Sequence, residues 1–342
     1  MSAVDVDVAV VGAGPAGLAT AIGAAQAGLS VAVLDPRAAP VDKACGEGLM
    51  PTARAELARL GVIPRGREFG GIRYCAPGAV AEARFREAPG LAVRRLALSA
   101  ALDERAREVG VRRLHERAGS PRVTDDGVDV GPLRARWLVA ADGLHSPTRR
   151  ALGLDAPAQA PTRFGLRRHY RTAPWTDLVE VHWAPDAEAY VTPLGEDLVG
   201  VAVLCGGGEP FEGWLDRFPA LRERLEGADP DGPVRGAGPL RQTAAAVRRG
   251  PVLLVGDAAG YVDALTGEGV GAALLAAREL VRCLAAGRPQ DYPAAHRRVT
   301  RRSRLLTTAL LAAGQVPPAR RVLVPAAARW PRLMTAAVRA LA

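Results

Sequence analysis

The sequence predicts an α/β fold: a largely parallel sheet flanked by helices, interleaved with a second, antiparallel sheet and followed by C-terminal helices. Three observations lead to this prediction. A valine-rich run at 6–11 enters the glycine-rich segment 12–17. A second short apolar run, 252–255, enters another glycine-containing turn late in the chain. The stretch 163–206 breaks instead into short segments separated by turns, as antiparallel strands do.

Residues 6–35 predict a strand, a helix and a second strand. Val6–Val11 is short and apolar, which is typical of a buried parallel strand. The alanine-rich segment Ala16–Ala27 has high helix propensity, and Gly28 ends the helix. Ser30–Leu34 then forms the second strand, with Asp35 at its end.

The turn between the first strand and helix has the spacing of a dinucleotide site. Gly12 allows the tight turn, Gly14 lets the backbone approach a pyrophosphate, and Gly17 lets the helix pack close to the strand. The N-terminus of that helix points its free N–H groups and positive dipole at the phosphate. Asp35, eighteen residues past Gly17, stands where an acid holds a ribose hydroxyl. The motif alone does not separate NAD from FAD.

Further elements follow from periodicity and turn residues. A hairpin over 71–93 is expected outside the first domain, in which we predict a helix over Arg95–Val109, a strand over Val111–His115, a hairpin over Val123–Val130 and a strand over Trp137–Ala141. In the second we predict strands over Phe164–Arg171, Leu178–Trp183, Ala189–Pro193 and Leu198–Leu204, and a helix over Phe211–Leu225. Val252–Val255 returns to the buried-strand pattern, before a helix over Gly269–Ala286.

These elements divide the chain into discontinuous domains. The nucleotide-binding domain is expected from residues 1–70, 94–162 and 234–289. The hairpin 71–93 and residues 163–233 are expected to form a substrate domain. Residues 290–342 form a C-terminal helical tail.

Composition argues against a nucleic-acid partner. The formal charge of +9 comes almost entirely from arginine, with Lys43 the single lysine, which indicates a generally basic surface rather than a binding patch. Aromatic residues make up 4% of the chain, too few for base-stacking platforms.

The cysteines and the N-terminus indicate a cytoplasmic protein. Cys45, Cys75, Cys205 and Cys283 form no CxxC pair and no metal-ligand spacing, so we expect a reducing setting and no metal. The first strand begins too early for a signal peptide, and no apolar run is long enough to span a membrane.

Three separated segments carry a family resemblance. They are Gly12-Ala13-Gly14-Pro15-Ala16-Gly17, Asp142-Gly143-Leu144-His145-Ser146 and Gly256-Asp257-Ala258-Ala259-Gly260. Together they resemble the para-hydroxybenzoate-hydroxylase-fold flavoproteins, which include the class A FAD monooxygenases and the geranylgeranyl reductases. The resemblance covers about residues 4–285. It implies a Rossmann-like FAD-binding domain of the glutathione-reductase type.

The resemblance also implies cofactor contacts. Asp142 would lie near the pyrophosphate, Asp257 would bind the ribityl hydroxyls, and the helix opened by residues 266–269 would face the flavin pyrimidine with its positive dipole. Asp263-Ala264 replaces the family's Asp-Pro, which affects the expected loop shape. The predicted cofactor-binding residues are Gly12, Gly14, Pro15, Ala16, Gly17, Asp35, Pro36, Arg37, Cys45, Gly46, Arg95 (or its neighbour Arg94), Asp142, Gly143, Gly256, Asp257, Gly267, Glu268, Gly269 and Val270.

Two branches of the superfamily remain open. Lys43–Leu49 is similar to the Cys-Gly-Glu-Gly-Leu segment of archaeal-type geranylgeranyl reductases. Glu188–Pro193, however, keeps only part of their Tyr-x-Trp-x-Phe-Pro signature, and the chain is short. We therefore favour an FAD-dependent monooxygenase that uses NAD(P)H and O2 on an aromatic or lipophilic small molecule of secondary metabolism. A reductase of isoprenoid double bonds is the alternative. A flavin halogenase lacks support, and intact motifs argue against a non-catalytic FAD-binding scaffold.

Each branch predicts its own catalytic residues. A hydroxylase would use a base to deprotonate a phenol, and His169, His182 and Tyr190 on the covering sheet are the candidates. Such residues on half-buried strands can equally be packed residues with one hydrogen bond. A reductase would need a proton donor, for which Cys45 is the candidate. This cysteine can equally be a small buried residue in a cofactor loop.

The tail has two interpretations. Arginines at 297, 298, 301, 302 and 304 precede apolar residues, and Pro317-Pro318 breaks the helix. Such a helix can lie on an anionic membrane, or it can pack on the flavin domain with its arginines outward. We favour packing, with the tail capping an apolar substrate pocket. The sequence does not indicate the oligomeric state or the choice between NADH and NADPH.

Overall fold

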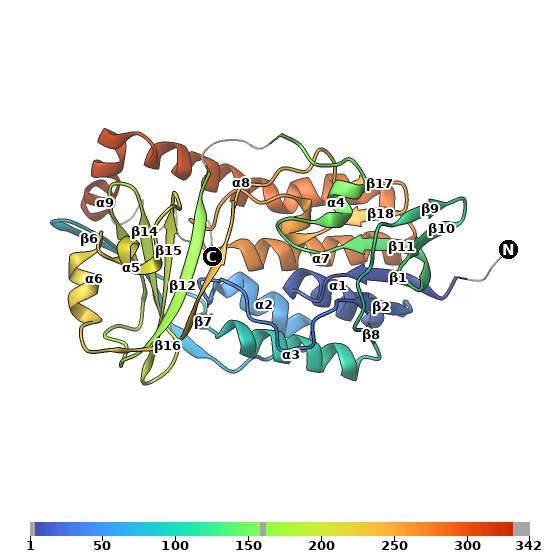
Figure 1. Cartoon of the computed structure of the whole chain (residues 1–342), viewed down its shortest axis with the longest axis horizontal. Coiled ribbons are helices and arrows are strands. Elements are labelled where there is room, and N and C mark those ends of the chain that lie inside the picture. The colour runs from blue at the N-terminus through green and yellow to red at the C-terminus, as the bar shows by residue number, and fades with distance from the viewer. Residues whose placement is uncertain (1–3, 158–161, 331–342) are drawn as a thin grey trace.

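The computed structural model describes residues 4–157 and 162–330, with two large sheets at opposite ends of the molecule (Figure 1). A small three-stranded sheet includes the segments just before and just after the hairpin 71–84 of the second sheet. Its strands are β3 (Gly48–Leu49), β4 (Arg67–Phe69) and β7 (Gly90–Ala92).

The first sheet has the order β17-β18-β11-β1-β2-β8, with the β9–β10 hairpin attached to β11. The central strand β1 runs parallel to both β2 and β11, and β18 is parallel to β11. The strands are β1 (Val6–Val11), β2 (Val31–Leu34), β8 (Arg112–Leu114), β9 (Arg122–Thr124), β10 (Gly127–Val130), β11 (Leu133–Ala140), β17 (Arg248–Arg249) and β18 (Val252–Leu254).

Both faces of β1 are covered, which explains why its residues are apolar except for Asp7, whose carboxylate accepts hydrogen bonds from Ser30. Val8 and Val10 belong to a core shared with three helices, whereas Ala9 and Val11 pack in a second core with residues of β10 and β11. The three helices are α1 (Pro15–Gln26), α3 (Arg95–Glu108) and α7 (Gly269–Ala285), and α2 (Pro51–Arg59) adds to the same core. The predicted strand–helix–strand unit is confirmed.

The second sheet has the order β16-β12-β15-β14-β13-β5-β6. Its strands are β5 (Gly71–Ala76), β6 (Ala79–Arg84), β12 (Phe164–Arg171), β13 (Val179–Trp183), β14 (Glu188–Pro193), β15 (Leu198–Cys205) and β16 (Asp229–Ala237). The four strands predicted between 163 and 206 are present and antiparallel. The early hairpin β5–β6 joins them through a parallel pairing of β5 with β13. Short helices α5 (Phe211–Leu215) and α6 (Pro219–Arg224) pack on the outer face.

Three predictions need correction. The single helix expected over Phe211–Leu225 is two helices, because the chain turns before Pro219, which starts α6. The strand β16 was not expected, since its sequence is rich in proline, glycine and aspartate. It is an edge strand, where proline is tolerated, and it extends past the expected domain boundary at 233/234. Residues 90–92 of the predicted hairpin join the small sheet instead.

The remaining helices include α4 (Pro147–Ala151), η1 (Gly256–Ala259), η2 (Pro289–Asp291), α8 (Tyr292–Gly314) and α9 (Pro317–Arg329). As expected, α8 ends before Pro317 and packs with one face inward. Its arginines at 297, 298, 301 and 302 are exposed. Leu306 and Leu311 pack against cores that include Tyr190 and Trp183. None of the described helices combines the length and apolar character needed to cross a membrane. Residues 331–342 of the predicted tail lie outside the described residues.

Candidate flavin site

A cavity of about 880 Å³ lies between the two large sheets and brings the three motif segments together. Its wall on the first-sheet side includes Gly14, Asp142, Gly143, Asp257 and Gly267. These residues are far apart in the sequence, and the parallel order of β1, β11 and β18 puts the strand ends that precede the three motifs at one edge. A cavity of this size is suited to a cofactor together with a small-molecule substrate.

Each glycine of the first motif is required for a different structural reason. Gly12 has φ +101°, and a Cβ there would lie 2.4 Å from the Ala141 carbonyl oxygen. A Cβ on Gly17 would lie 1.9 Å from the Gly12 carbonyl oxygen, so both positions exclude a side chain. Gly14 has open space around it on the cavity side. The backbone can therefore be approached closely at the N-terminus of α1, as a pyrophosphate requires.

Asp35 ends β2 as a buried, ionised carboxylate. It accepts a hydrogen bond from the Ala13 backbone N–H at 2.9 Å and pairs with Arg37 at 2.8 Å. Burial opposes ionisation, but the hydrogen bonds from Arg37 and Ala13 outweigh it and lower the Asp35 pKa. Arg37 lines the cavity, whereas Pro36 between them is exposed.

The middle and late motifs are tied to each other by Arg149. This guanidinium is fully buried and donates to the carbonyl oxygens of Leu144 and Ala258, each at 3.1 Å. Asp142 accepts from the Thr148 N–H at 2.9 Å, so it shapes the turn into α4 as well as facing the cavity. Asp257 forms an ion pair with Lys43 at 3.3 Å.

Arg95, rather than Arg94, faces the cavity. The Arg95 side chain lines it, and its Nε is buried without a hydrogen-bond partner among the described residues. Arg94 instead pairs with Asp231 at 3.2 Å and contacts His169. An unpartnered guanidinium nitrogen on a residue that lines the cavity fits an anionic cofactor group.

Most of the predicted cofactor residues line this cavity. Those that do not are Gly12, Gly17, Asp35, Pro36 and Glu268. The two glycines allow the tight turn before α1, and Asp35 holds this turn through the Ala13 N–H. Burial raises the pKa of Glu268, which lies at the N-terminus of α7.

The opposite wall of the cavity is largely apolar. It is formed by alternate residues of the second sheet, including Ile72, Val179, Val181 and Leu204. Two phenols interrupt it. Burial raises the pKa of Tyr74 to about 12 and that of Tyr190 well above its usual range, so both are uncharged at neutral pH.

The three predicted bases are all engaged elsewhere. The Tyr190 hydroxyl donates to the Leu265 carbonyl oxygen at 2.7 Å. His182 is on the outer face of the sheet, since its neighbour Val181 lines the cavity, and it bonds to Glu180 at 3.0 Å. His169 is buried 2.6 Å from Glu47. Cys45, by contrast, lines the cavity.

Cys75, Glu180 and His182 lie with their ligand atoms within 4.8 Å of one another on that outer face. Glu180 already accepts hydrogen bonds from Arg73, Trp175 and His182. Burial opposes its ionisation, but the bonds from His182 and Trp175 outweigh burial and lower its pKa to about 2. Because the Arg73 guanidinium would repel a cation, we interpret this group as a hydrogen-bonded cluster.

The predictions from the sequence did not include the polar residues that hold the Cys45 loop. Asp42, Glu47 and Arg167 are all held by ion pairs or hydrogen bonds at the edge of the cavity. One signal for Glu47 was present: it is the lone charged residue in the Cys-Gly-Glu-Gly segment. Nothing local indicated Arg167, whose partners come from the distant loop.

The fold and this site define an FAD-dependent oxidoreductase that acts on a small-molecule substrate. The chain matches the FAD binding domain family over residues 5–73 and 91–288, and it belongs to that family. Its fold is of the para-hydroxybenzoate-hydroxylase type, as the sequence resemblance predicted.

Two named relatives are reductases. The menaquinone reductase of Mycolicibacterium smegmatis is 31% identical over 98% of this chain and 91% of its own. Digeranylgeranylglycerophospholipid reductase 1 of Methanopyrus kandleri is 33% identical over 80% of this chain and 78% of its own.

Solved structures share the fold across most of the chain. A flavin-dependent brominase superposes with a TM-score of 0.84 at 18% identity, covering 98% of this chain and 93% of its own. A geranylgeranyl bacteriochlorophyll reductase-like protein from Thermoplasma acidophilum gives 0.78 at 22% identity, with 91% and 88% covered. At these identities the likeness concerns the fold alone.

Proposed function

We propose that this protein reduces carbon–carbon double bonds in an isoprenoid lipid or isoprenoid quinone, with NAD(P)H as the electron donor. The similarity to the two reductases across most of the chain supports this alternative over the monooxygenase that the sequence alone favoured. The apolar wall formed by the second sheet suits a hydrocarbon chain.

The cavity residues suggest how FAD would be held. The backbone at Gly14 and the N-terminus of α1 would receive the pyrophosphate, with Arg95 as a cationic partner. Asp35 and Arg37 would lie toward the adenosine end, and Asp257 toward the ribityl chain. The N-terminus of α7, at Gly267–Val270, would stabilise negative charge on the reduced ring. Bound FAD would supply the hydride after reduction by NAD(P)H.

One observation carries the proposal: the Cys45 thiol lines a cavity that also has an apolar wall, while the three predicted bases, Tyr190, His169 and His182, are engaged elsewhere. When hydride adds to one alkene carbon, the other needs a proton. The Cys45 S–H would donate it and become a thiolate, which water would protonate again. The Glu47 backbone N–H, 3.4 Å from the sulfur, would stabilise that thiolate.

The test is a product analysis. The purified protein with FAD would be given NADH or NADPH, without oxygen, and a menaquinone or a geranylgeranyl lipid. We expect mass spectrometry to show the gain of two hydrogen atoms in the side chain. Repeating the reaction in air with phenolic substrates separates the alternatives, because a monooxygenase would add one oxygen atom instead. No hydrogenated lipid with either donor would contradict the proposal.

We also propose that the outward face of α8 contacts an anionic membrane that delivers the substrate. Arg301, Arg302 and Leu305 are exposed on this helix, and Leu305 keeps 59% of its surface exposed. Leu306, the next residue, packs against the core around Tyr190. We expect cosedimentation with anionic vesicles, lost at high salt and in the double variant Arg301→Glu, Arg302→Glu. Equal binding to uncharged vesicles would argue against this contact.

A further inference from the structure

The loop that carries Cys45 is held by a buried carboxylate. Glu47 is 3% exposed, and among the described residues it is the one non-glycine with positive φ, at 59°. Such a backbone conformation costs free energy and persists only where the surroundings fix it. The contacts of Glu47 therefore need to be strong.

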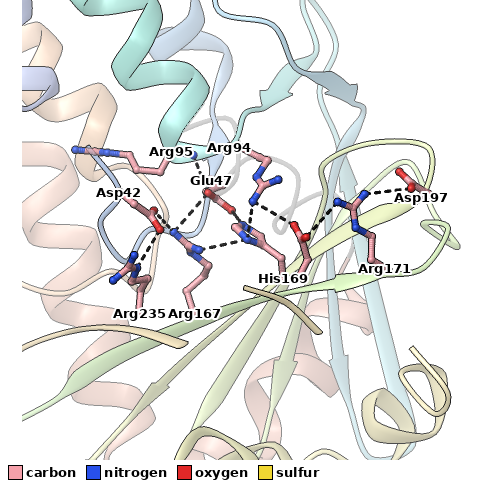
Figure 2. A network of polar contacts seen from close by, with 10 residues as sticks. Asp42, Glu47, Arg94, Arg95, Arg167, His169, Arg171, Asp197 and Arg235 are labelled. Atoms are coloured by element: carbon pink, nitrogen blue, oxygen red, sulfur yellow. Dashed lines mark hydrogen bonds and ion pairs between the residues drawn. The ribbon is translucent and has the colours of Figure 1, made fainter. Parts of the chain in front are cut away.

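Glu47 joins the loop to two other elements (Figure 2). One carboxylate oxygen accepts a hydrogen bond from the Arg95 backbone N–H, at the start of α3, at 2.7 Å. The other oxygen is 2.6 Å from His169 Nε2 on β12. His169 Nδ1 faces the guanidinium of Arg167 at 3.3 Å and that of Arg94 at 3.5 Å. Guanidinium groups only donate, so Nδ1 accepts and Nε2 carries the hydrogen given to Glu47.

The second sheet offers a row of three residues to this loop. Thr192, Gly200 and His169 lie opposite one another on the adjacent strands β14, β15 and β12. The Thr192 hydroxyl donates to the Gly46 carbonyl oxygen at 2.7 Å. Gly200 leaves the space between them: a Cβ there would lie 3.2 Å from a Glu47 carboxylate oxygen and 3.0 Å from Leu194. These three residues thus form the surface against which Gly46 and Glu47 pack.

The other end of the loop is held as well. Asp42 pairs with Arg167 and, at 3.0 Å, with Arg235. Cys45 lies between the two attachments, with its sulfur 3.4 Å from the Glu47 N–H. A segment of glycine and small residues would otherwise sample many conformations.

We propose that Glu47, His169 and Thr192 are positioning residues that fix the Cys45-Gly46 backbone at the cavity wall. Proton transfer to a bound substrate requires a donor at a defined position, and these contacts hold Cys45 at such a position. The positioning of Cys45 follows from the geometry of the loop. Only its consequence for proton donation rests on the proposed function.

The test is the alkylation rate of Cys45 in the full chain with FAD bound, followed by peptide mass spectrometry after iodoacetamide. Glu47→Ala and Gly200→Ala should release the loop and raise the Cys45 rate about tenfold, the effect of losing roughly one hydrogen bond. Glu47→Gln keeps an acceptor for the Arg95 N–H and should fall between Glu47→Ala and the unchanged protein. Cys75, partly exposed on the outer face of the sheet, should keep its rate.

Gly195→Ala is the matched control, because its added methyl would make ordinary contact, 3.5 Å from Leu198. If it raised the Cys45 rate as much as Gly200→Ala, general loosening would explain the result and the proposal would fail. Unchanged Cys45 rates in Glu47→Ala and Gly200→Ala, both with retained FAD absorbance, would also overturn it. A raised alkylation rate in a protein that reduces no lipid would support positioning and count against the proposed function alone.

Discussion

Two buried polar clusters lie beside the cavity, and each holds one flavin-facing loop against the second sheet. The Glu47 cluster (Asp42, Glu47, Arg167 and His169) holds the Cys45 loop. The Glu188 cluster (Arg163, Glu188, Asp263 and Arg320) holds the loop that leads into α7. In the second cluster Arg320 is 2.7 Å from Glu188, and Arg163 is 3.0 Å from Asp263.

The two clusters differ in which parts of the chain they join. The Glu47 cluster uses a loop and a strand that border the cavity. The Glu188 cluster includes Arg320 of α9, which also donates to the carbonyl oxygens of Ala184 and Ala187 and lies over the Trp183 ring. The loop before α7 is therefore coupled to α9, whereas no described contact joins the Cys45 loop to that helix. Disturbing α9 should affect one side of the cavity only.

The largest effect is expected at Glu188. Its replacement by alanine leaves Arg163 and Arg320 buried without this carboxylate, which costs about 3–5 kcal/mol for broken buried ion pairs. Urea unfolding of Glu188→Ala would measure the loss. Glu212→Ala is the control, since its pair with Arg168 is exposed and should contribute less than about 1 kcal/mol. Equal losses of unfolding free energy in both variants would mean that the Glu188 cluster contributes no more to stability than an exposed ion pair.

The pH dependence of stability should differ between Glu180, on the outer face of the second sheet, and Asp263 of the Glu188 cluster. The Glu180 pKa is lowered from 4.5 to about 2, so its contribution is present above pH 4.5 and lost as the pH falls toward 2. The shift corresponds to roughly 3 kcal/mol, which Glu180→Gln should lack in that window. Burial raises the Asp263 pKa despite Arg163, so its contribution has the opposite sign and declines as the pH rises above about 3.8.

Urea unfolding at several pH values would follow both carboxylates. The difference in stability between the unchanged protein and Glu180→Gln should grow as the pH rises from 2 to 4.5. For Asp263→Asn, the corresponding difference should shrink with rising pH. Parallel trends in the two variants would show that the hydrogen bonds from His182 and Trp175 do not lower the Glu180 pKa.

The smallest effect is expected at Tyr190, which ties β14 to the loop held by the Glu188 cluster. Tyr190→Phe removes the bond to the Leu265 carbonyl oxygen and should cost about 1 kcal/mol in urea unfolding. The reduction rate should change little. A loss of a hundredfold or more, measured with the lipid assay, would instead indicate the catalytic base first expected at this position.

The sequence predicted best what depends on neighbours in the chain. The turn at Gly12–Gly17 and the strand before it are local, and the four antiparallel strands are separated by clear turn residues. The Glu47–His169 contact could not be predicted, because it depends on the register that sets His169 opposite Gly200. The outward direction of His182 follows from the alternation of side chains along β13, because its neighbour Val181 lines the cavity. The strand β16 has an unfavourable composition and forms only because β12 offers it an edge.

The parallel pairing of β5 with β13 has a consequence for biosynthesis. The first sheet draws strands from residues 6–254 and the second from 71–237, so neither can be completed while the early chain leaves the ribosome. Such long-range pairings make folding slow. Asp257, Gly267 and Val270, which follow β18 in the chain, also line the cofactor cavity, so we expect FAD capture to be a late event. A nascent chain stalled before β18 would contain every strand of the second sheet but an unfinished first sheet, whose open edge would be exposed to aggregation and to chaperones.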